Sequence, residues 1–412
     1  MVSGFWVLLR AAIIAVAVAA AFALAQAAEP LPVKIGFSMP LSGPLASTGK
    51  AVLLTYKMWA EETNAAGGLL GRRVELVYYD DQSNPTTVPG IYAKLLDVDH
   101  VDVVIGSYGT NLTAPALPTV MPTHKIFLSL FALAANEEFH YPNYFSMFPA
   151  GPNSVKDFSR GYFELAKGAG LKTVAIVSAD TDFAKKAADG ARDNAKSMGF
   201  HIVYERSYPP ATVDFSPILR AVSATAPDFV YIASYPTDSV GILRAKNEIG
   251  LTTKMFGGGM VGPQYGALKM PLGELLNGAV NYDFYVPSPT LRFAGIDEFL
   301  RRYQERAAEG GVDPLGYFVP PFAYANLQVL AQAASSAGSL RSEDIAKHLH
   351  ADEFNTVVGK VRYGADGEWV QPRILQVQYS GIVGGGLQQF KDPRTYTVLY
   401  PRELASGELQ HD

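Results

Sequence analysis

After residue 32, short runs rich in β-branched and aromatic residues alternate with longer amphipathic stretches. The run 33–38 predicts a buried strand, and the stretch 46–64 predicts a helix, because Leu54 and Met58 recur at a spacing that places them on one helical face. The alternation continues with strands expected at 74–79, 101–105 and 126–130 and helices at 86–96 and 111–121. Four β-α units are therefore expected by about residue 135.

The same alternation restarts after residue 170. Strands are expected at 173–178, 201–208, 229–233 and 254–257, and helices at 183–198, 216–224 and 238–249. Alternating β and α elements are typical of a mostly parallel sheet with helices on both faces. Two such series predict an α/β protein with two Rossmann-like lobes, although the halves share no repeat at the residue level.

Three segments depart from this alternation. The stretch 148–153 separates the two series, and the stretch 283–289 carries two prolines before a helical region. Two long helices and a terminal hairpin are then expected at 290–308, 319–337 and 357–380, the hairpin turning at 365–367. The late helices are best explained if the chain returns to the first lobe. Two lobes joined by more than one segment would form a hinge with a cleft between them.

The first 28 residues predict a secretory signal peptide. Arg10 precedes an uninterrupted apolar run, 11–25, that is shorter than the ~20 residues needed to span a bilayer. The run ends in the small-residue motif Ala25-Gln26-Ala27, so cleavage is expected near Ala27 or Ala28. An uncleaved N-terminal anchor is the alternative. The sequence has no cysteine, which excludes a Cys-linked lipoprotein, and the expected location is the periplasm.

Composition and motifs mainly exclude functions. The net charge of −5 disfavours a nucleic-acid partner, which would call for a basic surface. The sequence contains neither the H-E-x-x-H nor the G-x-S-x-G motif, and its histidines lack the spacing of metal ligands. The stretch 43–50 resembles a phosphate-binding loop but has one residue too many before its Gly-Lys pair. We therefore expect no enzyme activity, no cofactor and no metal.

One glycine motif calls for separate treatment. Gly257, Gly259 and Gly262 match the G-x-G-x-x-G pattern of dinucleotide-binding proteins. However, Pro263 and Pro271 would interrupt the helix that should receive the pyrophosphate. We interpret these residues as a glycine-rich strand end that lines a cleft.

Several other strand ends carry residues suited to a cleft, because ligands of open parallel sheets bind beyond the carboxyl ends of the strands. The strand 101–105 is followed by Tyr108-Gly109-Thr110, and Thr110 or Asn111 can cap the next helix, whose free N–H groups can hold a carboxylate. Across the cleft, Phe183 and Tyr235 follow strands of the second series. The alternative is that these aromatic residues belong to the core.

These residues resemble the periplasmic solute-binding proteins of branched-chain amino-acid ABC transporters, the type I, Leu/Ile/Val-binding-like group. The resemblance extends over nearly the whole mature chain. It is carried by Pro40-Leu41-Ser42-Gly43-Pro44, by 64–71, by Val74-Glu75-Leu76-Val77 with Asp80-Asp81, by Val104-Ile105-Gly106, by Asp214-Phe215-Ser216 and by Asp228-Phe229-Val230-Tyr231.

The resemblance implies two α/β lobes joined by a three-stranded hinge, with ligand capture by hinge closure. It divides the chain into a signal peptide at 1–28, a first lobe from 29–147 and 284–368, and a second lobe from 148–283 and 369–412. It also implies a monomer that delivers its ligand to an inner-membrane ABC permease without catalysis. The alternative is an exported sensor that uses the same fold to signal to a membrane partner.

The family's ligand-contacting positions transfer unevenly: Phe183 stands where the family often has a Tyr, and the spacing from Ser129 to Asn136 differs from the family's by one residue. Gly259 stands where amino-acid binders of the family carry a Glu that pairs with the ligand's ammonium, and a desolvated ammonium without a carboxylate costs several kcal/mol. We therefore expect a ligand with a carboxylate or amide end: an amino acid or, given Gly259, an aromatic or aliphatic acid or amide. The expected ligand-binding residues are Thr48, Tyr108, Gly109, Thr110, Phe131, Ala132, Phe183, Tyr235 and Gly259.

Overall fold

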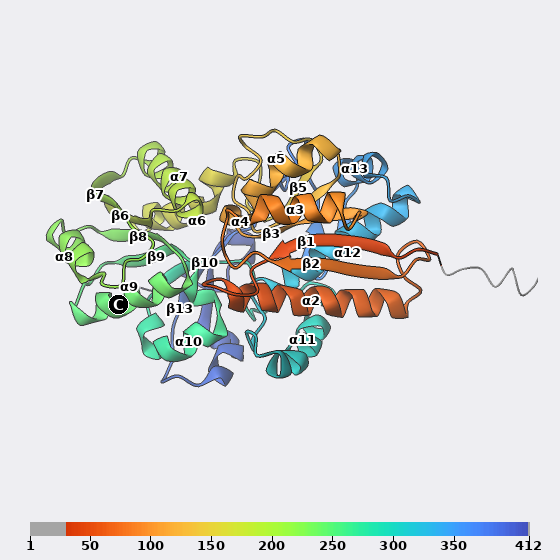
Figure 1. Ribbon diagram of the computed structural model, residues 1–412. Coiled ribbons are helices and arrows are strands. Elements are labelled where there is room, and N and C mark those ends of the chain that lie inside the picture. The colour runs from red at the N-terminus through yellow and green to blue at the C-terminus, as the bar shows by residue number, and fades with distance from the viewer. Residues whose placement is uncertain (1–29, 411–412) are drawn as a thin grey trace, which may run out of the picture.

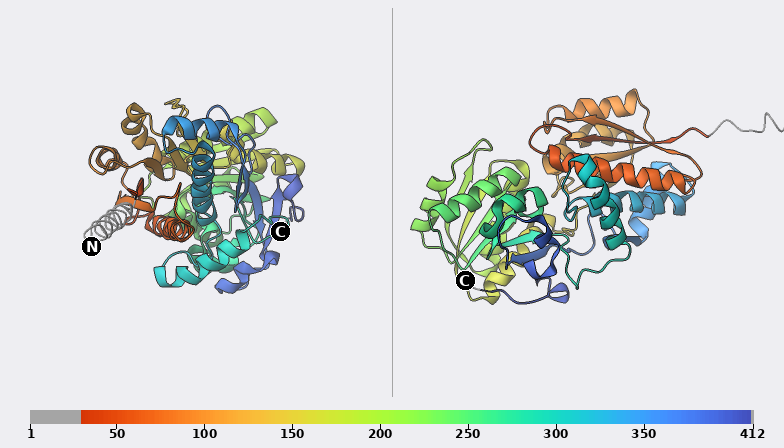
Figure 2. Two further views of the ribbon diagram at one scale, coloured as in Figure 1. Left: turned by 90° about the vertical axis from the view of Figure 1, so that its right-hand side faces the viewer. Right: turned by 90° about the horizontal axis from the view of Figure 1, so that it is seen from below.

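The computed structural model describes residues 30–410, so the predicted signal peptide lies outside the described residues. Two sheets, each flanked by helices, lie side by side (Figures 1 and 2). Parallel strands alternate with helices in both, which confirms the predicted α/β fold class. Among the described residues, no helix has both the length and the apolar character needed to cross a membrane.

The first sheet has five strands, all parallel, in the order β2-β1-β3-β4-β5. Every residue of β3 is buried, as expected for a strand that is covered by helices on both faces. The strands are β1 (Val33–Met39), β2 (Val74–Asp80), β3 (Val103–Tyr108), β4 (Phe127–Leu130) and β5 (Tyr144–Met147), and the helices between them are α2 (Ala46–Ala65), α3 (Val88–Asp97), α4 (Thr110–Thr113) and α5 (Leu117–Val120).

The second sheet has seven strands in the order β14-β13-β10-β9-β8-β6-β7. The strands β6 to β10 are parallel, whereas β13 runs antiparallel to both β10 and β14. Its strands are β6 (Thr173–Ala179), β7 (His201–Tyr208), β8 (Phe229–Ser234), β9 (Met255–Met260), β10 (Val280–Asp283), β13 (Leu375–Tyr379) and β14 (Tyr396–Tyr400), with α6 (Ser154–Gly168), α7 (Asp182–Met198), α8 (Ser216–Ala224), α9 (Pro236–Glu248) and α10 (Gly266–Leu272).

The late helices return to the first sheet. The helix α12 contacts α2, β4 and β5, and it is apolar around most of its circumference because it is buried between them. The segment comprises α11 (Ile296–Gly310), α12 (Pro320–Ala337), α13 (Ser342–Ala351) and a small hairpin of β11 (Phe354–Thr356) and β12 (Gly359–Val361).

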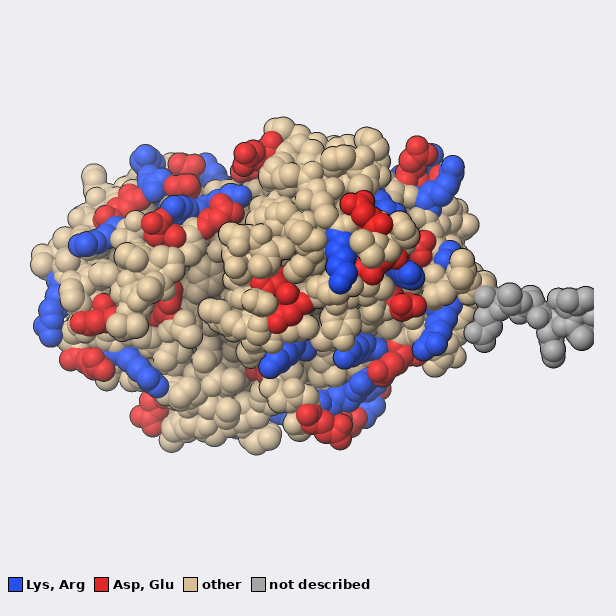
Figure 3. Space-filling model, in the orientation of Figure 1, with Lys and Arg blue, Asp and Glu red and all other residues tan. Residues whose placement is uncertain are grey.

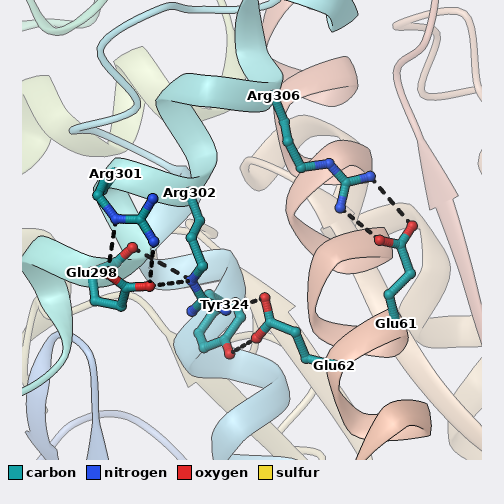
Figure 4. Close-up of polar contacts among 7 residues, drawn as sticks. All are labelled: Glu61, Glu62, Glu298, Arg301, Arg302, Arg306 and Tyr324. Carbon is teal, nitrogen blue, oxygen red and sulfur yellow. Dashed lines mark hydrogen bonds and ion pairs between the residues drawn. The ribbon is translucent and has the colours of Figure 1, made fainter.

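A polar network fastens α11 and α12 to α2 (Figure 4). Arg306 pairs with Glu61 at 2.6 Å, and Arg302 pairs with Glu62. The hydroxyl of Tyr324 donates to the second carboxylate oxygen of Glu62 at 2.5 Å. These contacts join residues more than 200 positions apart in the chain and hold the late helices against the first sheet.

The chain passes between the two sheets three times. We call these stretches the crossing segments: 148–153 between β5 and α6, 284–295 between β10 and α11, and 362–374 between β12 and β13. The order of the strands therefore builds each half from two stretches of sequence that are far apart.

Three local expectations were wrong. The region 111–121 is not one helix but short helical turns interrupted by prolines, which cannot donate the helical hydrogen bond. The tail 357–380 is not one hairpin. The strand β12 pairs with β11, whereas β13 pairs with β10 and β14. The turn at 365–367 closes only an isolated bridge between Tyr363 and Trp369. The helix expected at 290–308 begins later, at Ile296.

Candidate ligand-binding site

A cavity lies between the two halves, beyond the carboxyl ends of strands from both sheets. It is small, about 30 Å³, and apolar side chains form most of its wall. Its position agrees with the rule that open α/β sheets bind ligands at this edge. The lining residues are Leu45, Tyr108, Gly109, Thr110, Asn111, Phe131, Phe148, Phe183, Tyr235, Val261, Tyr282, Phe284 and Phe318.

Aromatic rings from several separate stretches of the chain meet at Phe131, which follows β4. Its ring lies 4.7 Å from that of Phe284, 5.3 Å from that of Phe318 and 5.6 Å from that of Phe148, measured between centroids. The rings of Phe284 and Phe318 stack nearly parallel, at 9°. Such tilted and offset arrangements are favourable for aromatic pairs and give the cavity a rigid apolar wall.

Hydrogen-bond donors lie at the turn after β3. Gly109 has a φ of 80°, a conformation that favours glycine and turns the chain sharply into α4. The hydroxyl oxygen of Thr110 accepts from the backbone N–H of Leu133 at 2.9 Å, which leaves its own proton free to donate. First-turn N–H groups, such as those of Thr110 and Asn111, have no partner within a helix. This turn can therefore hold a carboxylate through neutral donors.

Three polar contacts bridge the halves beside the cavity. The backbone N–H of Phe183 donates to the side-chain oxygen of Asn111 at 3.2 Å. The hydroxyl of Thr48 donates to that of Tyr265 at 2.8 Å, and the hydroxyls of Tyr265 and Tyr108 are 3.1 Å apart. Thr48 thus does not line the cavity but is linked to it through Tyr265.

No charged side chain lines the cavity among the described residues. Three acidic side chains close in sequence to Phe183 or Tyr235 have other partners: Asp180 pairs with Lys185 at 2.5 Å, Asp182 lies 3.6 Å from Lys186, and Asp238 accepts a hydrogen bond from Tyr208 at 3.2 Å. Burial raises the pKa of Tyr108 well above its usual value, so its hydroxyl stays neutral and can donate at physiological pH.

The structure brings six of the nine predicted site residues together around the cavity: Tyr108, Gly109, Thr110, Phe131, Phe183 and Tyr235. Besides Thr48, two others do not line it. Ala132 is fully buried in the core. Gly259 lies inside β9, where a β-carbon would come within 2.8 Å of the backbone oxygen of Ile232. The β9 end reaches the cavity through Val261 instead.

Sequence reasoning did not assign seven of the lining residues to the site. Asn111 and Val261 follow strand ends. Sequence reasoning gave Asn111 only the role of a helix cap. After the later strand it assigned Gly259 to the site, and Gly259 lies two residues before Val261. Phe148 and Phe284 begin crossing segments, where their neighbours in space are distant in sequence. The full set is Leu45, Asn111, Phe148, Val261, Tyr282, Phe284 and Phe318.

Three other hollows among the described residues are larger, at about 510, 450 and 350 Å³, but none of them lies at the carboxyl ends of the parallel strands. The part of the chain that the structure describes contains no group of three or more His, Asp or Glu side chains that could hold a metal ion. On the face in Figure 3, acidic and basic side chains are interspersed over both halves, so no patch of one sign covers it. The interlobe cavity is the candidate functional site.

Two α/β lobes with three crossing segments around an apolar cavity define a binding protein of the two-lobed class. A family model described as "Periplasmic binding protein" matches residues 32–381, and the chain therefore belongs to this family. The family predicted from the sequence is thus confirmed.

Known proteins similar to this chain agree with this membership. The "Leu/Ile/Val-binding protein homolog 7" of Brucella abortus is 25% identical over 389 residues, covering 92% of this chain and 94% of its own. A Rhodopseudomonas palustris solute-binding protein in complex with benzoate aligns at a TM-score of 0.74 and 18% identity, covering 92% of this chain and 98% of its own. A Streptococcus pneumoniae branched-chain amino acid transporter protein in complex with isoleucine aligns at 0.71 and 21%, covering 90% and 100%.

Proposed function

We propose that this protein is the periplasmic solute-binding component of an ABC importer and that it captures a small aromatic or aliphatic acid. The observation that carries the choice of ligand is the uncharged cavity: no Asp or Glu of the described residues lines it. An amino acid would bring an ammonium group with no carboxylate to pair with it. The cost of burying such a charge is several kcal/mol.

A carboxylate, in contrast, finds suitable donors. The turn at Gly109-Thr110-Asn111 offers backbone N–H groups and the Thr110 hydroxyl proton, and hydrogen bonds from such donors to an ionised oxygen are about twice as strong as neutral ones. Phe131, Phe284 and their neighbours would contact the apolar body of the ligand. The donors and the aromatic wall together favour an acid with an apolar ring or chain.

Structural neighbours bind both kinds of ligand. The Rhodopseudomonas palustris proteins were crystallised with benzoate and with 3,4-dihydroxybenzoic acid, whereas the Streptococcus pneumoniae protein holds isoleucine. All three have this fold, so the fold alone does not select the ligand. We propose that the residues lining the cavity select the ligand, and these residues favour an acid over an amino acid.

Ligand entry on this proposal depends on movement of the lobes. The cavity of about 30 Å³ is far below the roughly 300–1,000 Å³ of pockets that hold small molecules. We propose that the lobes, 29–147 with 284–368 and 148–283 with 369–412, open about the three crossing segments and close over the ligand. The chain would be exported, cleaved near Ala27 or Ala28, and act as a monomer that docks on its permease.

The ligand class is tested by calorimetry on the purified mature protein with matched pairs of ligands. Leucine is compared with 4-methylpentanoate, and phenylalanine with 3-phenylpropanoate, because each pair differs only by the α-amino group. We expect each acid to bind at least about tenfold more tightly than its amino acid, which corresponds to ~1.4 kcal/mol. Tighter binding of leucine than of 4-methylpentanoate would show that the ammonium has a partner and that the proposal is wrong.

The importer is distinguished from the sensor in cells. Deleting the gene should abolish uptake of the labelled acid if the protein serves a permease. Unchanged uptake with loss of a transcriptional response to the acid would favour the sensor.

A further inference from the structure

Three buried hydroxyl groups form a row that crosses from one lobe to the other and back. Thr48 lies in the first turns of α2 and Tyr108 at the end of β3, both in the first lobe, whereas Tyr265 precedes α10 in the second. The Thr48 and Tyr265 oxygens are 2.8 Å apart, and the Tyr265 and Tyr108 oxygens are 3.1 Å apart. Each of the three residues is at most 6% exposed, so water does not compete for these bonds.

The direction of the row depends on where the hydroxyl protons lie. Thr48 donates to Tyr265, so Tyr265 must place its own single proton elsewhere. Either hydroxyl can donate in the bond between Tyr265 and Tyr108, and we infer that Tyr265 donates because Tyr108 lines the cavity, where its own proton can meet a ligand. The row therefore runs from Thr48 to Tyr265 to Tyr108. The one proton left over is that of Tyr108, and Tyr108 lines the cavity.

We propose that Tyr265 is a positioning residue for ligand binding: supported by Thr48, it orients the Tyr108 hydroxyl as a donor to an oxygen of the bound acid. The inference rests on the proposed function and adds two residues that do not line the cavity. Consecutive hydrogen bonds polarise one another, so the terminal Tyr108 donor is strengthened by the two bonds behind it. A ligand group without an acceptor, such as an ammonium, would leave this donor unpaired.

The row also links recognition to closure. Tyr265 is the only member from the second lobe, and both bonds of the row pass through it. Opening the lobes would break both bonds and release Tyr108 from its fixed orientation. The acid would thus meet its full set of donors only in the closed arrangement, which predicts a slower dissociation of acids than the cavity contacts alone would give.

The test is a double-mutant cycle with benzoate or whichever acid of the panel binds. Tyr265→Phe removes the bridging hydroxyl, Tyr108→Phe removes the terminal donor, and the third variant combines them. We expect Tyr108→Phe to weaken binding about tenfold and Tyr265→Phe about three- to tenfold. The double variant should be no weaker than Tyr108→Phe within about twofold, because Tyr265 acts only through Tyr108. Tyr303→Phe is the matched control: Tyr303 is a buried tyrosine of α11 outside the cavity, the row and the crossing segments, and the affinity of this variant for the acid should be unchanged.

The outcomes separate this inference from the proposed function. Additive losses in the double variant, or wild-type affinity in Tyr265→Phe, would overturn the positioning role while leaving acid binding intact. Failure of the wild type to bind any acid would overturn both.

If Tyr265→Phe does not fold, Thr48→Val removes the donor at the far end of the row. It should then weaken acid binding about twofold to fivefold and raise the dissociation rate, and an unchanged rate would overturn the inference.

Discussion

At the scale of single residues, the cavity depends on neutral donors that other contacts hold in place. Thr110 shows how this is achieved. Its hydroxyl accepts from the backbone of Leu133, so the side chain is fixed before any ligand arrives and its proton remains available. Pre-oriented donors of this kind bind a ligand without first losing side-chain freedom.

Thr110→Ala should therefore weaken both ligand binding and folding. Loss of the proton donor should cost about 1 kcal/mol of binding free energy, and the unpaired N–H of Leu133 about 1 kcal/mol of unfolding free energy. Calorimetry and thermal unfolding measure the two effects. Thr110→Ser keeps the hydroxyl and serves as the control, so equal losses in both variants would contradict this role.

A second residue-scale prediction concerns Glu368 in the third crossing segment. Burial raises the pKa of its carboxyl from 4.5 to about 8, so the folded protein holds a proton that the unfolded chain releases above pH 4.5. Its contribution to stability is thus complete below pH 4.5 and is lost as the pH rises to about 8.

Glu368→Gln removes this titration because an amide stays neutral. Between pH 5 and pH 8, the unfolding free energy of the wild type should fall by ~1–4 kcal/mol relative to the variant. Denaturant unfolding at both pH values measures the difference. Parallel pH profiles for the two proteins would show that the Glu368 carboxyl is ionised at low pH in the folded state.

At the scale of elements, close contact between helices explains residues that propensity alone would disfavour. Gly190 lies within α7, where glycine weakens a helix relative to alanine. A β-carbon there would lie 1.9 Å from the backbone oxygen of Val155 at the start of α6. The glycine therefore allows α6 and α7 to pack together.

Gly190→Ala should lower the unfolding free energy by about 2 kcal/mol, because the overpacking cost exceeds the gain in helix propensity. Gly168→Ala is the control: it lies at the end of α6 with nothing within 4 Å of its β-carbon, so it should be neutral or slightly stabilising. Thermal unfolding of the two variants decides the question, and similar melting temperatures would argue against the close contact.

Local patterns predicted most of the elements but not every pairing. The strand 229–233 could be predicted because it is a continuous apolar run, and the strand 33–38 because Val33, Ile35 and Phe37 alternate with other residues. The strand β14 and the antiparallel position of β13 could not, because no local pattern specifies that β13 lies between β10 and β14. Strand ends located Tyr108, Thr110 and Tyr235, since that rule needs only the order of elements along the chain.

At the scale of the whole molecule, the cavity is assembled from stretches that are distant in sequence. Phe148, Phe284 and Phe318 meet because the chain crosses between the lobes, and only the path of the crossing segments brings them together. This is why Phe148, Phe284 and Phe318 were missed while Phe131 and the turn at Gly109 were found. The same path makes the cavity sensitive to how the lobes are arranged.

Small-angle X-ray scattering should detect this sensitivity. We expect the ligand-free protein to be more extended than the acid-saturated protein, because ligand contacts on both lobes favour closure. An amino acid that does not bind is the control. Identical profiles with and without a verified ligand would contradict capture by closure.

The late position of β13 and β14 has a consequence for biosynthesis. β13 pairs with the edge of β10, whose four residues are all buried, and β14 pairs with β13, yet both strands come late in the chain, at 375–379 and 396–400. Until they emerge, the nascent polypeptide carries an open strand edge that readily pairs with other chains. A product that ends before β13 should therefore aggregate more readily than the full chain.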